Sequence, residues 1–493
     1  MNTRWFAIPI AAALLATACG GDDKADPATN DGGQTAAPAG NAANCPVEAL
    51  ASASGPVEIN MWYAFQGVAA QGLDQMAADY NASQSKVVIK VSNQGNYEEQ
   101  LTKYKTALAA PDTLPALMTA EDTQTRFLLD SKSIVTAEDC LAADPDAKDL
   151  YADLVPAVEA AYTVDGQLLP VGFGVSNPVL YFNRTQFTTA GLNPEQPPAT
   201  LAELRSAAEK LKAAAIPGLE EPLVLKMDSW FIEHWVTGEK TELVDQDNGR
   251  AGPPSEALID SPEVAEVTAW IKGMIDDELL KAVRSNDDIS AYLAVATQSG
   301  AMLIETSAAI TTIDAAIAGT LDASILPQAA GLPLEDLEFG TLDAGVAAMP
   351  GVKAAGKGQI GGNAWYIAKK SPEQIAAAWD FIKFANSKDA QVKWTSRSGY
   401  LPSHQQAAED PALQSEWTSS RKGGWLKTAY ASILSLDPEF TGPLIGAYPA
   451  FRTEARSALD AIAFEGADPT ARFAEAKTKV DTAFAEYAKN PGQ

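Results

Sequence analysis

Aromatic side chains recur in loops and at the ends of expected strands. They are Trp62, Tyr63, Phe65, Tyr97, Trp230, Trp365, Tyr366, Trp394 and Tyr400. Sugar rings have apolar C–H faces that stack on aromatic rings, and hydroxyl groups that need hydrogen-bond donors and acceptors. Nearby polar residues supply such groups: Gln66, Gln94, Asp122, Ser176 and Ser307. The combination indicates a site that binds a polyhydroxylated molecule, with Tyr97 and Trp230 favoured because turn-forming residues flank them.

The sequence has few residues in patterns that could form a catalytic site or a metal site. His234 and His404 are isolated from each other and from the three cysteines, so we expect no metal and no cofactor. Glu121 and Asp122 are the best carboxylate pair for glycoside hydrolysis, but adjacent strand residues point to opposite faces. We therefore expect a protein that is not an enzyme. A secreted carbohydrate-active hydrolase stays open as a weaker alternative.

The positions above lie at the ends of a repeating pattern of elements. Strands are expected at 57–62, 87–91 and 116–120, with helices around 73–80 and 101–108 between them. This β-α-β-α-β order predicts a parallel sheet, in which ligands lie beyond the carboxyl ends of the strands. Those ends carry Tyr63 and Gln66, then Tyr97, then Asp122.

A second α/β unit follows. Strands are expected at 179–182, 223–225 and 301–304, and helices at 200–214, 262–275 and 289–297. Strand-like segments at 345–349 and 364–368 precede helices over 372–395, and the last quarter of the chain is mostly helical. The fold class is therefore α/β.

The N-terminus has the features of an export signal over residues 1–18. Arg4 precedes the apolar run 5–15, which is too short for the ~20 residues of a membrane-spanning helix. Small residues then precede Cys19, as in a bacterial lipobox, so we expect lipid on Cys19 and a location on the outer face of the bacterial plasma membrane. Ordinary cleavage and free secretion is the alternative. Residues 20–44 contain no large apolar side chain, and we expect a flexible tether over 19–55.

The remaining cysteines, Cys45 and Cys140, are expected to form a disulfide in an oxidising compartment. Two separate buried thiols are the alternative. The formal net charge of −28 argues against a nucleic-acid partner and against direct binding to anionic lipid, since both need basic patches. Contact with the membrane is therefore expected through the lipid anchor alone.

Five segments occur in a familiar order: 94–98 (QGNYE), 176–183 (SNPVLYFN), 190–194 (AGLNP), 360–362 (IGG) and 398–402 (SGYLP). Together they resemble the family 1 extracellular solute-binding proteins of ABC importers, within it the glycerol-3-phosphate/sugar-binding type. The resemblance implies a two-lobed periplasmic-binding-protein-like fold, each lobe a sheet flanked by helices, with the ligand cleft between the lobes. It places lobe 1 at 56–170 and 349–399 and lobe 2 at 171–348 and 400–486. The partners implied are a small sugar or polyol and the permease subunits, with the protein itself a monomer.

The resemblance also suggests ligand contacts. Family contacts carry over to Tyr97, Ser176, Gly362 and Tyr400, less securely to Trp230 and Ser307, and an acid after the third strand corresponds to Asp122.

Glycerol-3-phosphate binders have an Arg eight residues before the Arg that corresponds to Arg452, and here that position is Leu444. We therefore expect a carbohydrate or polyol derivative as the ligand, with glycerol 3-phosphate bound no tighter than the millimolar range. A glycerophosphodiester or glycerol-3-phosphate receptor, with Lys226 or another Arg as the clamp, is the alternative. A peptide or polyamine receptor of the same fold is disfavoured by the aromatic strand ends.

Overall fold

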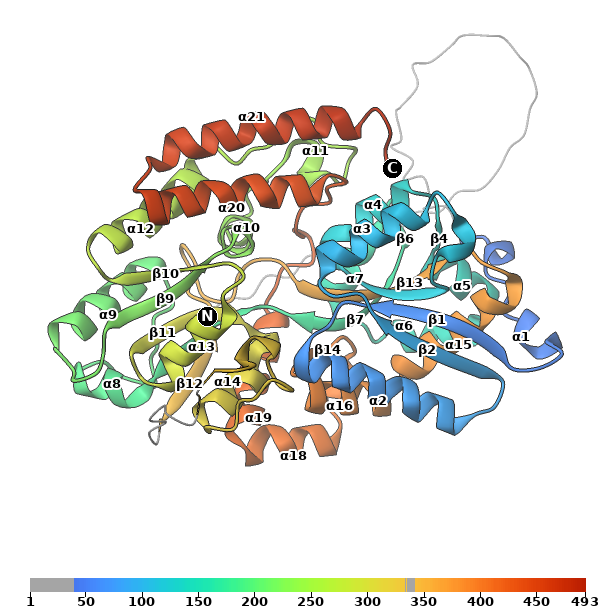
Figure 1. The fold of residues 1–493 in the computed structure, drawn as a ribbon, viewed down its shortest axis with the longest axis horizontal. Helices are drawn as coiled ribbons and strands as arrows, with labels where there is room; N and C mark the ends of the chain where they lie inside the picture. The colour runs from blue at the N-terminus through green and yellow to red at the C-terminus, as the bar shows by residue number, and fades with distance from the viewer. Residues whose placement is uncertain (1–39, 333, 335–341) are drawn as a thin grey trace, which may run out of the picture. The chain divides into compact units, whose positions relative to one another are not determined.

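The computed structural model describes residues 40–332, 334 and 342–493. The expected signal segment, Cys19 and the first part of the expected tether lie outside the described residues. The described chain forms two mixed sheets with helices packed on them, which is the two-lobed α/β architecture expected from the sequence (Figure 1).

The first sheet has the strand order β14-β7-β13-β3-β1-β2, and β4 also pairs with β13. Its strands are β1 (Val57–Tyr63), β2 (Val87–Asn93), β3 (Leu117–Glu121), β4 (Ile134–Val135), β7 (Val171–Ser176), β13 (Gly361–Ala368) and β14 (Leu401–Pro402). β1 pairs in parallel with β2 and β3, as the β-α-β-α-β pattern predicted. β13 runs antiparallel to both β3 and β7, so later parts of the chain complete this sheet.

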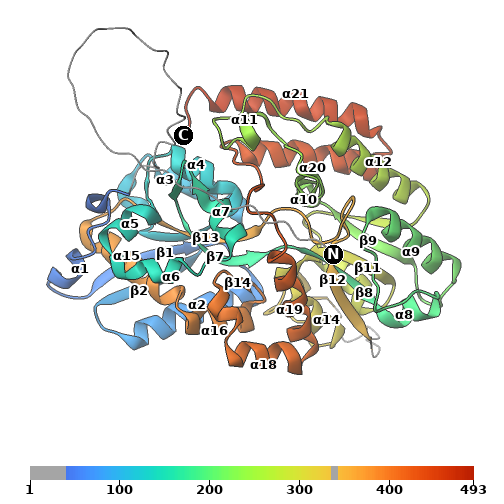
Figure 2. The same ribbon diagram turned by 180° about the vertical axis from the view of Figure 1, so that it is seen from behind.

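Helices surround the first sheet and extend below it (Figure 2). They are α1 (Ala49–Ser52), α2 (Gly67–Ser83), α3 (Tyr97–Ala107), α4 (Thr125–Asp130), α5 (Ala137–Ala143), α6 (Lys148–Tyr151), α7 (Pro156–Tyr162), α15 (Pro372–Ala385), α16 (Lys388–Ser398), α17 (Gln405–Ala408) and α18 (Pro411–Ser419). A short hairpin of β5 (Thr163–Val164) and β6 (Gln167–Leu168) precedes β7.

The second sheet has the order β10-β9-β11-β8-β12. Its strands are β8 (Pro178–Asn183), β9 (Glu221–Met227), β10 (Leu280–Arg284), β11 (Gly300–Thr306) and β12 (Ala344–Ala348). Its helices are α8 (Arg184–Thr189), α9 (Leu201–Ala213), α10 (Ser229–Gly238), α11 (Asp245–Asn248), α12 (Pro262–Asp276), α13 (Asp288–Ala296), α14 (Ile310–Ile317), α19 (Arg421–Ile433), α20 (Tyr448–Glu465) and α21 (Pro469–Tyr487).

Both faces of the second sheet are buried. Leu223 and Leu225 pack in one core with residues of α9, α12, α20 and α21. Val224, between them, packs in the other core with residues of α13 and α14. Because side chains alternate along a strand, helices on both faces require apolar residues at every position. This explains why the strands at 223–225 and 301–304 read as continuous apolar runs.

The crossings between the sheets differ from the expected lobe boundaries. Residues 171–176 were assigned to lobe 2, but β7 pairs with β13 and β14 in the first sheet. Residues 401–402 were also assigned to lobe 2, but β14 pairs with β7. Backbone hydrogen bonding therefore moves the first crossing to Asn177 and the last beyond β14, towards α19, which packs on β12 and α14. We propose lobe 1 as residues 56–176 and 361–420, and lobe 2 as 178–348 and 421–487.

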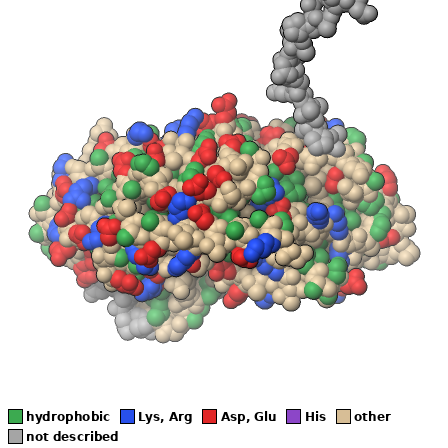
Figure 3. Space-filling model, turned by 90° about the horizontal axis from the view of Figure 1, so that it is seen from above, with side chains coloured by type: hydrophobic (Ala, Val, Ile, Leu, Met, Phe, Trp, Pro, Cys, Tyr) green, Lys and Arg blue, Asp and Glu red, His purple; other side chains and the backbone are tan. Residues whose placement is uncertain are grey.

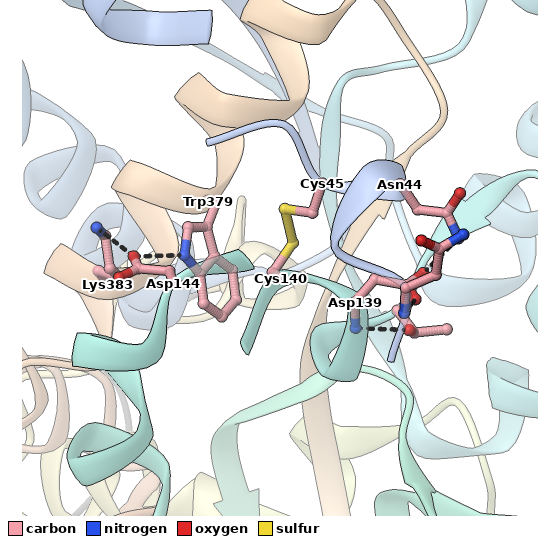
Figure 4. The surroundings of a disulfide bond; sticks show 9 residues. Asn44, Cys45, Asp139, Cys140, Asp144, Trp379 and Lys383 are labelled. Atoms are coloured by element: carbon pink, nitrogen blue, oxygen red, sulfur yellow. Dashed lines mark hydrogen bonds and ion pairs between the residues drawn. A yellow bond between two sulfur atoms is a disulfide. The ribbon is translucent and has the colours of Figure 1, made fainter. Parts of the chain in front are cut away.

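The N-terminal end of the described chain is fastened to lobe 1 by a disulfide (Figure 4). Cys45 and Cys140 are bonded, fully buried, and 4.9 Å apart at Cα, which confirms the expected pairing. Beside them, Asp139 accepts hydrogen bonds from the Asn41 N–H (2.7 Å) and Asn44 Nδ2 (3.1 Å). Residues 40–55 are thus part of the folded body, although the sequence placed them in the tether.

Candidate functional site

A hollow of about 270 Å³ lies where the two sheets face each other. Lobe 1 contributes residues at the ends of β3, β7 and β13 and beside α16. Lobe 2 contributes residues at the ends of β9 and β11 and from the starts of α10 and α20. The lining residues are Tyr97, Glu121, Ser176, Lys226, Asp228, Trp230, Phe231, Glu305, Thr306, Ala308, Gly361, Gly362, Asn363, Tyr400 and Arg452.

Two glycines at the start of β13 let the backbone approach the hollow closely. Gly362 has φ +134°, and a Cβ there would lie 2.0 Å from the carbonyl oxygen of Gly174. A Cβ on Gly361 would lie 2.8 Å from Cζ2 of Trp230. Only glycine satisfies the backbone conformation at 362, and a side chain at 361 would displace the indole ring. Gly361 therefore leaves room for the Trp230 indole, and Gly362 allows β13 to lie close to β7.

Trp230 projects from the first turn of α10. Asp228 caps this helix, since its Oδ1 accepts a hydrogen bond from the Trp230 N–H at 2.9 Å. The buried His234 ring and the indole lie edge to face, with their centroids 4.6 Å apart. Burial and the nearby charge of Arg452 lower the pKa of His234 to about 3, so this ring stays neutral at physiological pH. Trp230 is half-buried and is supported from behind by an uncharged ring.

Three polar groups from separate elements meet at the lobe 1 wall. Asn363 Nδ2 donates to Tyr97 Oη at 2.8 Å, and Tyr97 Oη lies 3.2 Å from Tyr400 Oη. The Tyr400 ring stacks on Trp394 with centroids 5.6 Å apart. Burial raises the pKa of Tyr400 to about 12 and raises the pKa of Tyr97 well above its usual value. Both hydroxyl groups therefore stay protonated and can donate hydrogen bonds.

The two cations of the hollow are each bound by two carboxylates. Lys226 Nζ lies 2.7 Å from both Asp288 and Glu305. Burial lowers the pKa of Lys226, but the charges of Glu305 and Asp288 outweigh burial and hold it above its usual value. Arg452 lies 3.0 Å from Glu121 of lobe 1 and 3.0 Å from Glu233 of lobe 2. Neither cation is free to receive an anionic ligand without competition.

A second hollow of about 300 Å³ adjoins the first. The two share Tyr97, Glu121, Asp228 and Arg452, which therefore lie at their boundary. We call the first hollow the inner compartment and the second the outer compartment. The other residues of the outer compartment are Asn96, Glu98, Leu101, Thr123, Gln124, Asn286, Tyr448, Pro449 and Arg456. The cleft thus offers aromatic faces in its inner part and mostly amides, hydroxyls and ion pairs in its outer part.

The structure brings five of the nine expected contact residues to the inner compartment: Tyr97, Ser176, Trp230, Gly362 and Tyr400. The other four line neither compartment. Tyr63 is buried and donates to Asp74 at 2.8 Å. Gln66 lies on the surface as the N-cap of α2. Ser307 is fully buried, and its Oγ accepts the N–H of Asn177 at 3.2 Å, at the first crossing between lobes.

Asp122 was expected at the site, but its neighbour Glu121 lines both compartments instead. Glu121 is the last residue of β3, and the chain turns into a short 3-10 helix (Asp122–Gln124) immediately after it. Adjacent residues leave a strand end in opposite directions, so a shift of one position exchanges the side chain that faces the cleft. Burial and the negative charge of Glu121 raise the pKa of Asp122 to about 8.

Several lining residues were not singled out from the sequence as contacts: Glu121, Asp228, Phe231, Glu305, Thr306, Asn363 and Arg452. Four of them are direct neighbours in the sequence of residues that were expected as contacts. The strand ends therefore indicated the right segments, although not the right side chains. Arg452 lies on a helix that is distant in sequence from every expected strand end, and only the family resemblance pointed to it. Leu444 is buried against Val164 and Leu169 and does not line either compartment, so it is not what faces a ligand.

Within residues 40–332, 334 and 342–493, no helix is long and apolar enough to cross a membrane. The same part of the chain has no group of three or more His, Cys, Asp or Glu arranged to hold a metal ion. Acidic and basic side chains are interspersed on the face seen in Figure 3, unlike the basic stripe typical of nucleic-acid binders.

Comparisons with known proteins agree with this geometry. Residues 75–420 match the family described as bacterial extracellular solute-binding protein. The sn-glycerol-3-phosphate-binding periplasmic protein UgpB of Escherichia coli K12 is 26% identical over 423 residues, covering 84% of this chain and 89% of that protein. UgpB from Mycobacterium tuberculosis, solved with glycerophosphocholine, has a TM-score of 0.67 at 18% identity, over 88% of this chain and 100% of that one. The GacH receptor of Streptomyces glaucescens, solved with acarbose, has a TM-score of 0.69 at 19% identity, over 88% and 99% of the two chains.

Proposed function

This chain belongs to the family of bacterial extracellular solute-binding proteins, and from that premise we propose that its cleft captures a carbohydrate or polyol derivative for an ABC importer. Members of this family bind a solute and release it unchanged, so the chain is a binding protein and not an enzyme. The family match gives no support to a hydrolase. The related protein of Escherichia coli binds glycerol 3-phosphate, and the two solved relatives were crystallised with a phosphodiester and with a pseudo-oligosaccharide.

One observation carries the preference for an uncharged ligand: each cation of the inner compartment is already bound by two carboxylates. A phosphate would have to displace Glu305 or Asp288 from Lys226, or Glu121 or Glu233 from Arg452. Separating a buried ion pair leaves an uncompensated charge, which costs several kcal/mol. A sugar needs no such exchange. Its hydroxyl groups can donate to carboxylate lone pairs that the cations leave free, and its ring can stack on Trp230.

A zwitterionic glycerophosphodiester is the second candidate, and Asp228 favours it. No Lys or Arg of the described residues pairs with Asp228, which lines both compartments next to Trp230. An unpaired carboxylate beside an indole face attracts a cationic group, and quaternary ammonium ions bind best to Trp. The cationic end of such a ligand would lie against Trp230, and its single phosphate charge would point away from the carboxylates.

A thermal-shift screen of sugars, polyols and glycerophosphodiesters tests the proposal. A ligand at 100 times its Kd adds about 2.7 kcal/mol to the free energy of unfolding. The best compound is then titrated calorimetrically into Trp230→Ala and into Trp270→Ala. Trp270 is a matched control because it is half-buried on lobe 2 and donates to Leu201, outside the cleft. Stronger loss of affinity in Trp230→Ala supports the site, and equal affinities in both variants and wild type would exclude it.

We also propose that Cys19 carries lipid and that the protein works as a monomer at the outer face of the plasma membrane, delivering ligand to permease subunits. The small residues before Cys19 and the polar segment after it support the anchor. Cys19→Ala should move the protein to the soluble fraction or leave it unprocessed. Membrane retention of a processed Cys19→Ala protein would contradict lipidation.

A further inference from the structure

Two arginines on α20 reach across the cleft to carboxylates of lobe 1. Arg452 NH1 lies 3.0 Å from Glu121 Oε1, at the end of β3. Arg456 NH2 lies 2.6 Å from Glu98 Oε1, in the first turn of α3. Residues four apart lie on the same face of a helix, so one face of α20 presents both guanidinium groups to the other lobe. Both pairs join residues far apart in the sequence and on different lobes.

Lobe 2 holds its half of this arrangement in place without help from lobe 1. Glu233, which is fully buried on α10, receives Arg452 Nε at 3.1 Å and NH2 at 3.0 Å. Ser229 and Tyr448 donate to the same carboxylate at 3.0 and 3.1 Å. A forked pair of this kind fixes the plane of the guanidinium, which leaves NH1 as the end directed at Glu121. Arg456 Nε in turn donates to the Arg452 carbonyl at 3.3 Å.

We propose that the Arg452–Glu121 and Arg456–Glu98 pairs form a latch that favours the closed arrangement of the lobes in the absence of any solute. Hinge closure in two-lobed proteins is an equilibrium between open and closed states, and contacts made only when closed shift it. All four side chains line the outer compartment, which adjoins the inner one, so the latch lies beside the candidate site. The proposal depends on the two-lobed fold and not on the class of ligand.

The two pairs should respond differently to salt. The side chains of Arg452 and Glu121 are 13% and 24% exposed, whereas those of Arg456 and Glu98 are 27% and 66% exposed. Salt screens exposed charges far more than buried ones, so the outer pair is the part of the latch that salt releases. A consequence is that even an uncharged ligand should bind more weakly as salt rises, because part of the closed state's stability comes from the latch.

The test is small-angle X-ray scattering of protein freed of bound solute by unfolding and refolding, at ~20 mM and ~500 mM NaCl. The variant is Glu98→Gln with Arg456→Gln. The matched control is Asp460→Asn with Arg284→Gln, which removes another exposed pair of α20, at 2.8 Å, that lies within lobe 2. Circular dichroism melts confirm that each variant folds.

We expect the radius of gyration of the wild type and the control to rise with salt. The latch variant should already be expanded at low salt and lose most of the salt response. From the usual strength of exposed pairs, its open-to-closed ratio should be about two- to fivefold larger than that of the wild type. Scattering from the latch variant that superimposes on the wild type at both salt concentrations would overturn the proposal. Equal expansion of the latch variant and the control would overturn it as well. Because no solute is added, either result leaves the proposed ligand class untouched.

Discussion

Replacing Glu121 with Gln should allow the cleft to bind glycerol 3-phosphate, which the wild type should bind no tighter than the millimolar range. The wild-type inner compartment has three carboxylates, Glu121, Asp228 and Glu305, against two cations, Lys226 and Arg452. The variant has two of each. More importantly, Arg452 keeps its forked bond to Glu233 while its NH1 loses the carboxylate 3.0 Å away. A positioned N–H donor then faces the compartment with no charged partner.

The expected gain in affinity for glycerol 3-phosphate follows from that single N–H donor of Arg452. A hydrogen bond to a charged group contributes about 1.5–3 kcal/mol, which corresponds to about 10- to 150-fold in Kd. Titration calorimetry with glycerol 3-phosphate, at low and at physiological salt, measures it. Glu454→Gln is the matched control, because Glu454 lies on the same helix as Arg452, pairs with Lys479 at 2.8 Å and lines neither compartment. It removes the same charge but frees only Lys479, which lies outside both compartments.

Two results would refute this reasoning. Micromolar binding of glycerol 3-phosphate to the wild type would mean that a phosphate does displace a carboxylate from Arg452 or Lys226. Equal improvement in Glu121→Gln and Glu454→Gln would mean that long-range repulsion by the acidic chain, and not occupation of the cations, excludes the phosphate.

Three further predictions concern single features. The pKa of Asp122 is raised to about 8 in the folded protein, so the preference of this carboxyl group to ionise destabilises the fold increasingly as the pH rises from about 4 to 8. Asp122→Asn should therefore be more thermally stable than the wild type at pH 8 but not at pH 4, as measured in paired thermal melts. Reduction of the Cys45–Cys140 bond, which spans 95 residues, should lower the free energy of unfolding by up to about 4–5 kcal/mol, and unchanged urea midpoints with and without reductant would contradict this. Gly361→Ala should displace the Trp230 indole and weaken solute binding on the order of tenfold in a calorimetric titration, whereas wild-type affinity would show that the ring has room to move.

The strands of the expected sheets could be predicted where their pattern is regular. Val57–Tyr63 alternates between buried and more exposed positions, which is the signature of a strand with one face less covered. Val171–Ser176 carries no such signal, since all six residues are buried and two are glycine. Both faces of this strand are covered by other parts of the chain, so no solvated face marks its period. No local pattern therefore corrected the boundary at residue 170 that the resemblance implied, and the pairing of this strand with β13 and β14 moves it to Asn177.

The sequence predicted which strand ends form the candidate site, but not which side chain at each strand end faces the cleft. Tyr97 and Trp230 were found because a turn or a helix cap precedes each of them. Asp122 and Ser307 were chosen one position away from Glu121 and Thr306, which line the cleft. Which of two adjacent residues faces the cleft depends on the backbone conformation at the end of the strand, and the sequence alone does not determine it. Arg452 depends on a contact across 331 residues, which no local pattern could reveal.

The interleaving of the two sheets has a consequence for how the chain acquires its structure. The first sheet needs β14, which ends at Pro402, so it cannot be completed until most of the 493 residues are available. The second sheet is closed by β12, but its covering helices α20 and α21 come last of all. Pairings between distant segments form slowly, because long loops must close before any contact stabilises them. Both lobes therefore become complete only after the last segments of the chain have been synthesised.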